Sequence, residues 1–303
     1  MQRIILDVDT GLDDAVALFL AAGLEEIQIE AVIATAGNVA LTRTLENTLN
    51  IMETTGLLCP VYEGSAGPLV RSAVEAGDFH GESGLDGPVF QPRSRQFVQS
   101  QRGVDAMIDL VLSNPGEITI VSVGPLTDLA RALQREPTLS TLAKGFVIMG
   151  GSFSGGNVTA EAEFNTYADP EAAKIVFSSG ANIALFSLDC TRTVTLSPAR
   201  LESFRAKGGR ANAVFVACMD TYTANYTKRG QGEPQMHDPL TVAYLADPSK
   251  VVGSHHGVDV IVEEGPSYGR TVKTDAKNTI FIAESIDIPW FWGLVERSLA
   301  ALP

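Results

Sequence analysis

Hydrophobic positions along the first two thirds of this chain follow two alternating periods. Five short runs rich in apolar and β-branched residues predict buried strands at residues 3–6, 27–35, 118–123, 145–149 and 182–186. Between them, apolar residues recur at helical spacing, which predicts helices at residues 14–22, 41–55, 104–112, 125–135 and 170–178. Strands that alternate with helices are typical of an α/β fold with a mainly parallel central sheet and helices on both faces.

The last third of the chain has a different pattern. Residues 197–227 are helical in pattern, residues 251–282 alternate like antiparallel strands, and residues 290–299 predict a final amphipathic helix. Residues 64–95 are rich in Gly, Pro and Ser, and an aperiodic connection of this length favours a binding loop or lid. No repeat or linker divides the chain. We therefore expect a single doubly wound α/β domain over residues 1–303, with a small C-terminal region of antiparallel strands.

Composition narrows the range of partners. The chain has 36 acidic and 22 basic residues, a net charge of -14, whereas nucleic-acid binding depends on clustered Lys and Arg. Three widely spaced cysteines, Cys59, Cys190 and Cys218, include no CxxC pair and favour reduced thiols in a cytoplasmic protein. The apolar run at residues 4–6 is too short for a signal peptide or a membrane span. We expect a cytoplasmic protein that acts on a small molecule, without nucleic-acid or membrane partners.

Four aspartates, Asp7, Asp9, Asp13 and Asp14, lie between the first predicted strand and the first predicted helix. In parallel α/β sheets, ligands bind beyond the carboxyl ends of the strands, where this segment falls. Like charges crowded into one turn repel unless a cation neutralises them, which predicts a hard divalent metal such as Ca²⁺ or Mg²⁺. The alternative is that Asp13 and Asp14 only favour the positive end of the helix, while the other two form a turn.

Two other metal motifs fit less well. An EF-hand loop counted from Asp7 requires Gly at its sixth position and Glu at its twelfth, where the chain has Leu12 and Leu18. Phosphotransferases of the haloacid dehalogenase type also end their first strand in Asp-x-Asp but continue with x-Thr, where the chain has Gly11. Because the Asp-x-Asp part of the motif is present, a Mg²⁺-dependent phosphotransferase with Asp7 as nucleophile stays open as an alternative.

A series of short motifs then runs along the chain. They are Asp-x-Asp-x-Gly-x-Asp-Asp-Ala at residues 7–15, Ala-Gly-Asn at 36–38, His-Gly-Glu-Ser-Gly at 80–84, Gly-Pro-Leu-Thr at 124–127, Met-Gly-Gly at 149–151, Ala-Glu-Phe-Asn at 162–165 and His-Asp-Pro at 237–239. This order resembles that of the inosine-uridine nucleoside hydrolase family over nearly the whole chain. The resemblance implies a homo-oligomeric N-glycosidase (dimer or tetramer) with a tightly held Ca²⁺. Such an enzyme hydrolyses ribonucleosides to ribose and free base in nucleoside salvage.

The resemblance also implies roles for individual residues. The metal ligands would be Asp9, Asp14, Asp238 and the backbone carbonyl of Val123. Asp9 is also the expected general base for the attacking water, because a bound cation lowers the pKa of its water. His237 is the expected proton donor to the departing base, since histidine titrates near neutral pH. Because Pro follows it, Asp238 also fits a plain helix N-cap, and only its place in the motif order indicates a ligand.

The substrate contacts implied by the resemblance are Asp13, Asn38, His80, Met149, Glu163, Asn165 and Tyr226. A negatively charged pocket would stabilise the oxocarbenium-like ribose that forms as the base departs. Glu163 and Asn165 are two residues apart, so an extended segment would direct both toward the ribose. For His80 a structural role is equally open, and Asp7 is expected to support the turn.

Two positions depart from the family pattern as we understand it. Most members have Pro where this chain has Thr10, and Gly often stands where this chain has Asp86. Asp86 adds a charge near the loop at residues 64–95, and the nucleobase preference is therefore open. A third reading, a protein that binds ribonucleosides without hydrolysing them, also stays open.

Overall fold

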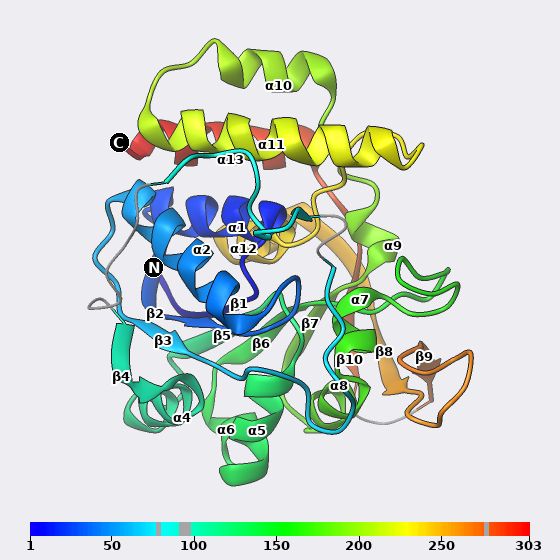
Figure 1. Cartoon of the computed structure of the whole chain (residues 1–303). Helices are drawn as coiled ribbons and strands as arrows, with labels where there is room; N and C mark the ends of the chain where they lie inside the picture. Colours follow the sequence, from blue (N-terminus) through cyan, green and yellow to red (C-terminus); the bar gives the residue numbers. More distant parts are fainter. Residues whose placement is uncertain (77–79, 91–97, 276–278) are drawn as a thin grey trace.

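The computed structural model describes residues 1–76, 80–90, 98–275 and 279–303 (Figure 1). Within these ranges one ten-stranded sheet has the strand order β4-β3-β2-β1-β5-β6-β7-β10-β8-β9. The strands from β4 to β10 pair in parallel, whereas β10 with β8 and β8 with β9 pair antiparallel. The predicted mainly parallel sheet with antiparallel C-terminal strands is confirmed.

The five predicted parallel strands are present with small changes at their ends: β1 (Gln2–Val8), β2 (Ile27–Ala34), β5 (Ile118–Ser122), β6 (Gly145–Met149) and β7 (Ile183–Phe186). The C-terminal strands are β8 (Val251–Val260), β9 (Thr271–Thr274) and β10 (Ile280–Ile286). Two strands at one end of the sheet, β3 (Val61–Glu63) and the edge strand β4 (Val98–Arg102), were not predicted. The first is too short to show a period and the second is mostly polar, so neither carries the pattern of a buried strand.

Helices cover both faces of the sheet, as predicted (Figure 1). One face carries α1 (Leu12–Gly23), α2 (Leu41–Thr55), α12 (Pro239–Ala246) and α13 (Ile288–Ala301), with α11 (Arg210–Lys228) and α10 (Pro198–Arg205) stacked beyond them. The other face carries α4 (Gly103–Ser113), α5 (Thr127–Arg135), α6 (Leu139–Leu142) and α8 (Pro170–Phe177). Three short pieces lie in connections: α7 (Phe164–Ala168), α9 (Leu188–Thr191) and the 3₁₀ turn η2 (Pro248–Lys250).

Strand β1 separates two hydrophobic cores. Ile4 and Leu6 belong to the core beneath α1, and Ile5 belongs to the core on the α5 side, because successive side chains of a strand point to opposite faces. Helix α1 itself is buried at residues 12–21. Since α1 starts directly beyond β1, its first turn carries two carboxylates, Asp13 and Asp14, into the interior of the protein.

The long loop predicted at residues 64–95 lies partly outside the described residues, at 77–79 and 91–95. Its described part passes along the carboxyl end of the sheet, where the backbone N–H of Ala76 donates to the carbonyl of Asn38. The ring of His80 accepts a hydrogen bond from the backbone N–H of Leu12. The loop thus reaches the start of α1. Within the described ranges, no helix combines the length and apolar character needed to cross a membrane.

Candidate active site

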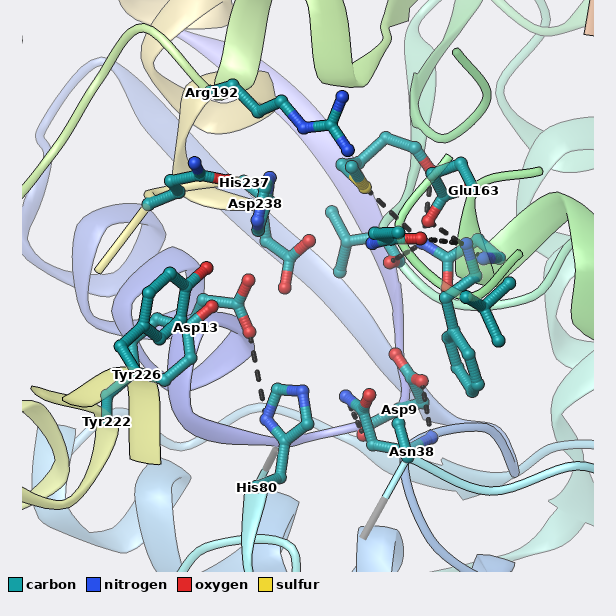
Figure 2. Close-up of a pocket in the computed structure, with 18 of the residues that line it drawn as sticks. Asp9, Asp13, Asn38, His80, Glu163, Arg192, Tyr222, Tyr226, His237 and Asp238 are labelled. Atoms are coloured by element: carbon teal, nitrogen blue, oxygen red, sulfur yellow. Dashed lines mark hydrogen bonds and ion pairs between the residues drawn. The ribbon is translucent and has the colours of Figure 1, made fainter. Parts of the chain in front are cut away.

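A cavity of about 650 Å³ opens at the carboxyl ends of the central strands (Figure 2). Of the site residues predicted from the sequence, Asp14 is buried and does not line the cavity. The others line it: Asp9, Asp13, Asn38, His80, Val123, Met149, Glu163, Asn165, Tyr226, His237 and Asp238. Segments separated by more than half of the chain therefore meet at one place.

Buried carboxylates gather at the floor of this cavity. Asp13, Asp14 and Asp238 each offer an oxygen within 4.8 Å of the others, and all three are buried. Burial raises the pKa of Asp13 to about 8, with a further contribution from the charge of Asp14. Burial also raises the pKa of Asp9 and of Asp238, and nearby carboxylates add to both shifts. In the described part of the chain, none of these four carboxylates forms an ion pair with Lys or Arg.

This arrangement fits a hard divalent cation. A cluster of buried like charges is unfavourable by itself, and carboxylate and carbonyl oxygens are the donors that Ca²⁺ and Mg²⁺ prefer. The most compact group of three contains Asp13, which was predicted to bind ribose, and does not contain Asp9. Asp9 lies at the edge of the same cluster, because its carboxylate interacts with those of Asp14 and Asp13.

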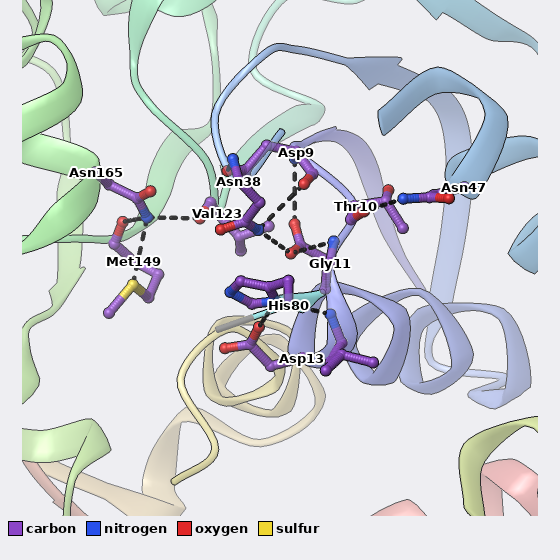
Figure 3. A network of polar contacts seen from close by, with 12 residues as sticks. Asp9, Thr10, Gly11, Asp13, Asn38, Asn47, His80, Val123, Met149 and Asn165 are labelled. Atoms are coloured by element: carbon purple, nitrogen blue, oxygen red, sulfur yellow. Dashed lines mark hydrogen bonds and ion pairs between the residues drawn. The ribbon is translucent and has the colours of Figure 1, made fainter. Parts of the chain in front are cut away.

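The turn that carries the aspartates is held by its own side chains (Figure 3). Asp14 accepts hydrogen bonds from the backbone N–H groups of Asp9 (3.1 Å) and Gly11 (2.9 Å). The side-chain amide of Asn38 donates to Asp14 (3.0 Å), and its backbone N–H donates to the Asp9 carboxylate (2.8 Å). Gly37 is needed beside it, because a Cβ at that position would lie 2.1 Å from Oδ2 of Asp9. These contacts fix the direction of the Asp9 carboxylate.

Asp7 does not take part in the site. The alternation along β1 turns its side chain to the opposite face of the sheet, where it accepts a hydrogen bond from Ser122 (3.0 Å) and faces Asp128. Asp7 is fully buried and does not line the cavity. The expectation that Asp7 supports the turn is therefore wrong. The phosphotransferase alternative also loses its nucleophile, since no substrate in the cavity can reach this carboxylate.

Glu163 and Asn165 both line the cavity, but not through an extended segment. Glu163 is the N-cap of α7, and its carboxylate accepts hydrogen bonds from the backbone N–H groups of Asn165 (2.8 Å), Thr166 (3.1 Å) and Gly151 (2.9 Å). The side-chain amide of Asn165 donates to the carbonyl of Val123 (2.6 Å), as Figure 3 shows. The expectation that Glu163 and Asn165 lie in an extended segment was wrong, because the Glu163 side chain caps a helix that begins at the next residue.

Two histidines line the cavity next to the carboxylates: Nδ1 of His80 lies 4.0 Å from Oδ1 of Asp13, and His237 directly precedes Asp238. Nδ1 of His80 accepts from a backbone N–H, so its ring proton is on Nε2, and burial lowers the pKa of this ring to about 4. Nδ1 of His237 lies 2.7 Å from Oγ1 of Thr191. Burial, together with Arg192 and His80, lowers the pKa of His237 to about 3. Both rings are therefore neutral at neutral pH in this structure.

An aromatic wall completes this part of the cavity. The ring of Tyr222 stacks beside His80 at a centroid distance of 6.1 Å and meets Tyr226 edge-on at 5.0 Å. Sequence reasoning named Tyr226 and missed Tyr222, although residues four apart share one face of a helix and that spacing could have identified it. Further lining residues that were missed are Glu75, Asn157, Arg192, Gln231 and Gln235. Arg229 also lines the cavity.

The two unusual positions do not enter the cavity. Oγ1 of Thr10 lies 2.7 Å from Oγ1 of Thr48, so this residue ties the aspartate turn to α2. The carboxylate of Asp86 accepts hydrogen bonds from the backbone N–H groups of Glu82 and Ser83. Hydrogen bonds within the loop therefore stabilise the negative charge of Asp86.

Comparison with known proteins agrees with this geometry. The model of the inosine-uridine preferring nucleoside hydrolase family matches residues 4–293. The chain belongs to this family. It is therefore an enzyme that hydrolyses ribonucleosides at the N-glycosidic bond, and family membership disfavours the phosphotransferase and the non-catalytic binding protein.

Individual relatives match the enzyme over almost its whole length. The chain is 38% identical to the pyrimidine-specific ribonucleoside hydrolase RihB of Escherichia coli, covering 98% of this chain and 96% of the relative. Its structure is similar to that of a purine-preferring ribonucleoside hydrolase from Gardnerella vaginalis, with a TM-score of 0.92 and 31% identity over 99% of both chains. A plant nucleoside hydrolase, PpNRh1, gives a TM-score of 0.91 and 29% identity over 99% of both chains.

Proposed function

We propose that this enzyme is a Ca²⁺-dependent ribonucleoside hydrolase that prefers pyrimidine ribonucleosides. The observation that carries the metal dependence is the group of buried carboxylates, Asp9, Asp13, Asp14 and Asp238, without Lys or Arg partners in the described chain. The base preference is supported by the relative that is 38% identical and is named as pyrimidine-specific. We also propose that the enzyme is cytoplasmic and forms a dimer or tetramer, which light scattering can measure.

The residues that would hold the cation are Asp9, Asp14, Asp238 and the carbonyl of Val123, with Asp13 close enough to share in ligation. When bound, a divalent cation neutralises the carboxylates and makes an attached water molecule more acidic. Oxygen ligands of this kind suit Ca²⁺ better than Mg²⁺ if they are numerous and irregular in direction. The backbone carbonyl and the carboxylates from separate segments provide such a set.

Asp9 is proposed to accept the proton of the attacking water. The backbone N–H of Asn38 and the close packing of Gly37 hold its carboxylate at the cavity floor. The surrounding carboxylates stabilise the positive charge that develops on the ribose as the bond to the base breaks. Asn165 and Glu163, which line the cavity nearby, are proposed to bind the ribose hydroxyls.

His237 is proposed to lie next to the departing base. Its Nδ1 is occupied by the Thr191 hydroxyl, so Nε2 is the atom left for the base. When the Thr191 hydroxyl donates, Nε2 carries the ring proton and can donate it. His80, Tyr222 and Tyr226 form the remaining wall against which a flat base can pack.

The direct test is release of ribose from uridine, cytidine, inosine and adenosine by the purified enzyme, with Ca²⁺ and after chelation. We expect turnover with Ca²⁺, faster with uridine and cytidine, and loss of turnover on chelation that Ca²⁺ restores. Asp9→Ala should abolish turnover. His237→Ala should slow nucleosides far more than a riboside with a good leaving group. Absence of ribose from every nucleoside in a Ca²⁺-replete sample would refute the proposal.

A further inference from the structure

Arg192 places a fixed positive charge in the wall of the cavity. It follows α9, beyond the carboxyl end of β7, and is half-buried. Its guanidinium donates one hydrogen bond to the carbonyl of Gly155 (2.9 Å) and one to the carbonyl of Gly156 (2.6 Å). Among the described residues no carboxylate forms an ion pair with it. Two neutral acceptors thus fix its direction without cancelling its charge.

The charge lies at the end of the cavity where the base is proposed to bind. Arg192 interacts electrostatically with His237 and with Tyr226. Figure 2 shows its side chain on the side of His237, across the cavity from Asp9 and Asn38. The other lining arginine, Arg229, is exposed at the rim beyond α11. The cavity is therefore polarised between the Asp9 carboxylate on one side and an oriented guanidinium on the other.

This polarity matches the charges that form when an N-glycosidic bond breaks. The electron pair of the bond between C1′ and the base nitrogen stays on the base, so the ribose becomes positive and the base becomes negative. Carboxylates stabilise the first charge, and the second requires a proton or a nearby positive group. A guanidinium remains protonated at any working pH, so it can supply positive charge without proton transfer.

We propose that Arg192 is a further catalytic residue, which stabilises the negative charge on the departing nucleobase by donating to the carbonyl oxygen next to the glycosidic nitrogen. This inference rests on the proposed function. Bases with such a carbonyl are the pyrimidin-2-ones, in which the electron pair is shared between the nitrogen and the oxygen. Water attacks C1′, and its proton passes to Asp9 and from there to solvent. The base leaves with its negative charge held by Arg192 and then takes the Nε2 proton of His237, which solvent restores. The sum is addition of one water to the nucleoside.

Arg192 could instead act only as a tether for the loop around Gly155 and Gly156. That loop has a second anchor, because the Asp189 carboxylate accepts a hydrogen bond from the backbone N–H of Phe153 (2.8 Å). Asp189 does not line the cavity. Asp189→Ala therefore weakens the same loop without removing the cavity charge, and it is a matched control for the tether.

The test compares wild type, Arg192→Gln, Arg192→Lys and Asp189→Ala on uridine, 5-fluorouridine and para-nitrophenyl riboside, all with Ca²⁺. For Arg192→Gln we expect kcat on uridine to fall about 10²-fold, the usual effect of losing one group that stabilises developing charge. The loss should be smaller on 5-fluorouridine, whose base is a more stable anion, and smallest on para-nitrophenyl riboside. Arg192→Lys should regain part of the lost rate, and Asp189→Ala should affect all three substrates alike.

Equal losses of Arg192→Gln on all three substrates would overturn the proposal, because these substrates share the ribose and differ only in the leaving group. A rise in KM with unchanged kcat would also overturn it and would indicate binding alone. The ratio of rates on two substrates does not depend on how much enzyme is folded, so a poorly folding variant still gives an answer. Failure of wild type to release ribose from any substrate would instead refute the proposed function, and this inference with it.

Discussion

Replacing Asp13 by Asn should stabilise the enzyme when no metal is bound, although it removes a residue of the active site. Asp13 is 4% exposed and lies in the first turn of the buried helix α1. Burial, then the charge of Asp14, raises its pKa from 3.8 to about 8. At pH 7 in the presence of a chelator, this carboxyl is protonated in the folded protein and ionised in the unfolded chain.

The sign and size of the effect follow from proton binding. The folded state binds more protons than the unfolded state between the two pKa values, so the stability of the chelated protein falls as the pH rises from about 4 to about 8. Each pH unit contributes about 1.4 kcal/mol, so keeping Asp13 folded at pH 7 costs at most about 4 kcal/mol. Asn has a similar shape and no ionisation, and Asp13→Asn therefore removes this cost.

Urea unfolding of chelated wild type and Asp13→Asn at several pH values between 4 and 8 measures the difference. We expect the variant to be more stable at pH 7 and the two proteins to converge toward pH 4. Ca²⁺ should reverse the order, because only the wild type keeps the full carboxylate cluster. The reasoning is refuted if chelated Asp13→Asn is less stable than wild type at pH 7, or if the difference does not depend on pH.

Asp86→Asn is a control, because folding lowers the pKa of Asp86 whereas it raises the pKa of Asp13. Burial of Asp86 is partial and would raise its pKa, but hydrogen bonds from Ser83 and Glu82 outweigh burial and lower it. Wild-type Asp86 therefore contributes stability that is present above the unfolded pKa and lost as the pH falls through the folded pKa. Asp86→Asn should be no more stable than wild type at pH 7.

Three further outcomes are expected. Ca²⁺ at about 100 times its dissociation constant should add about 2.7 kcal/mol to the unfolding free energy, measured as a rise in Tm over chelated protein, and an unchanged Tm would contradict metal binding. Gly37→Ala should lower kcat strongly, because its Cβ would lie 2.1 Å from the Asp9 carboxylate, whereas Gly67→Ala, with no atom within 4 Å of the added Cβ, should be silent. Asp7→Asn should keep ribose release within about tenfold, since Asp7 is outside the cavity and substitutions away from reacting groups have modest effects; complete loss of activity would return Asp7 to the mechanism.

The sequence alone determined the class of fold and most of the cavity wall. The long buried strands and amphipathic helices have strong periods, because each must bury one face or both, and all of the five strands predicted for the parallel part are present. The aspartates after β1 and the His-Asp pair before α12 are adjacent to such elements. Their places in the motif order, together with the rule that ligands bind beyond the carboxyl ends of the strands, were enough to predict that these residues share one site.

Only the tertiary structure decided which of these side chains face one another. Strand β1 ends at Val8, so Asp9 lies in the turn beyond the strand and faces the cavity, whereas Asp7 is still within the strand and points to Ser122 and Asp128. The carboxylate of Glu163 caps the start of α7. Arg192 has no periodic or motif signal, because its role depends on two carbonyls from a loop more than thirty residues earlier. Contacts between distant segments leave no local pattern, and it is these contacts that give the cavity its opposed charges.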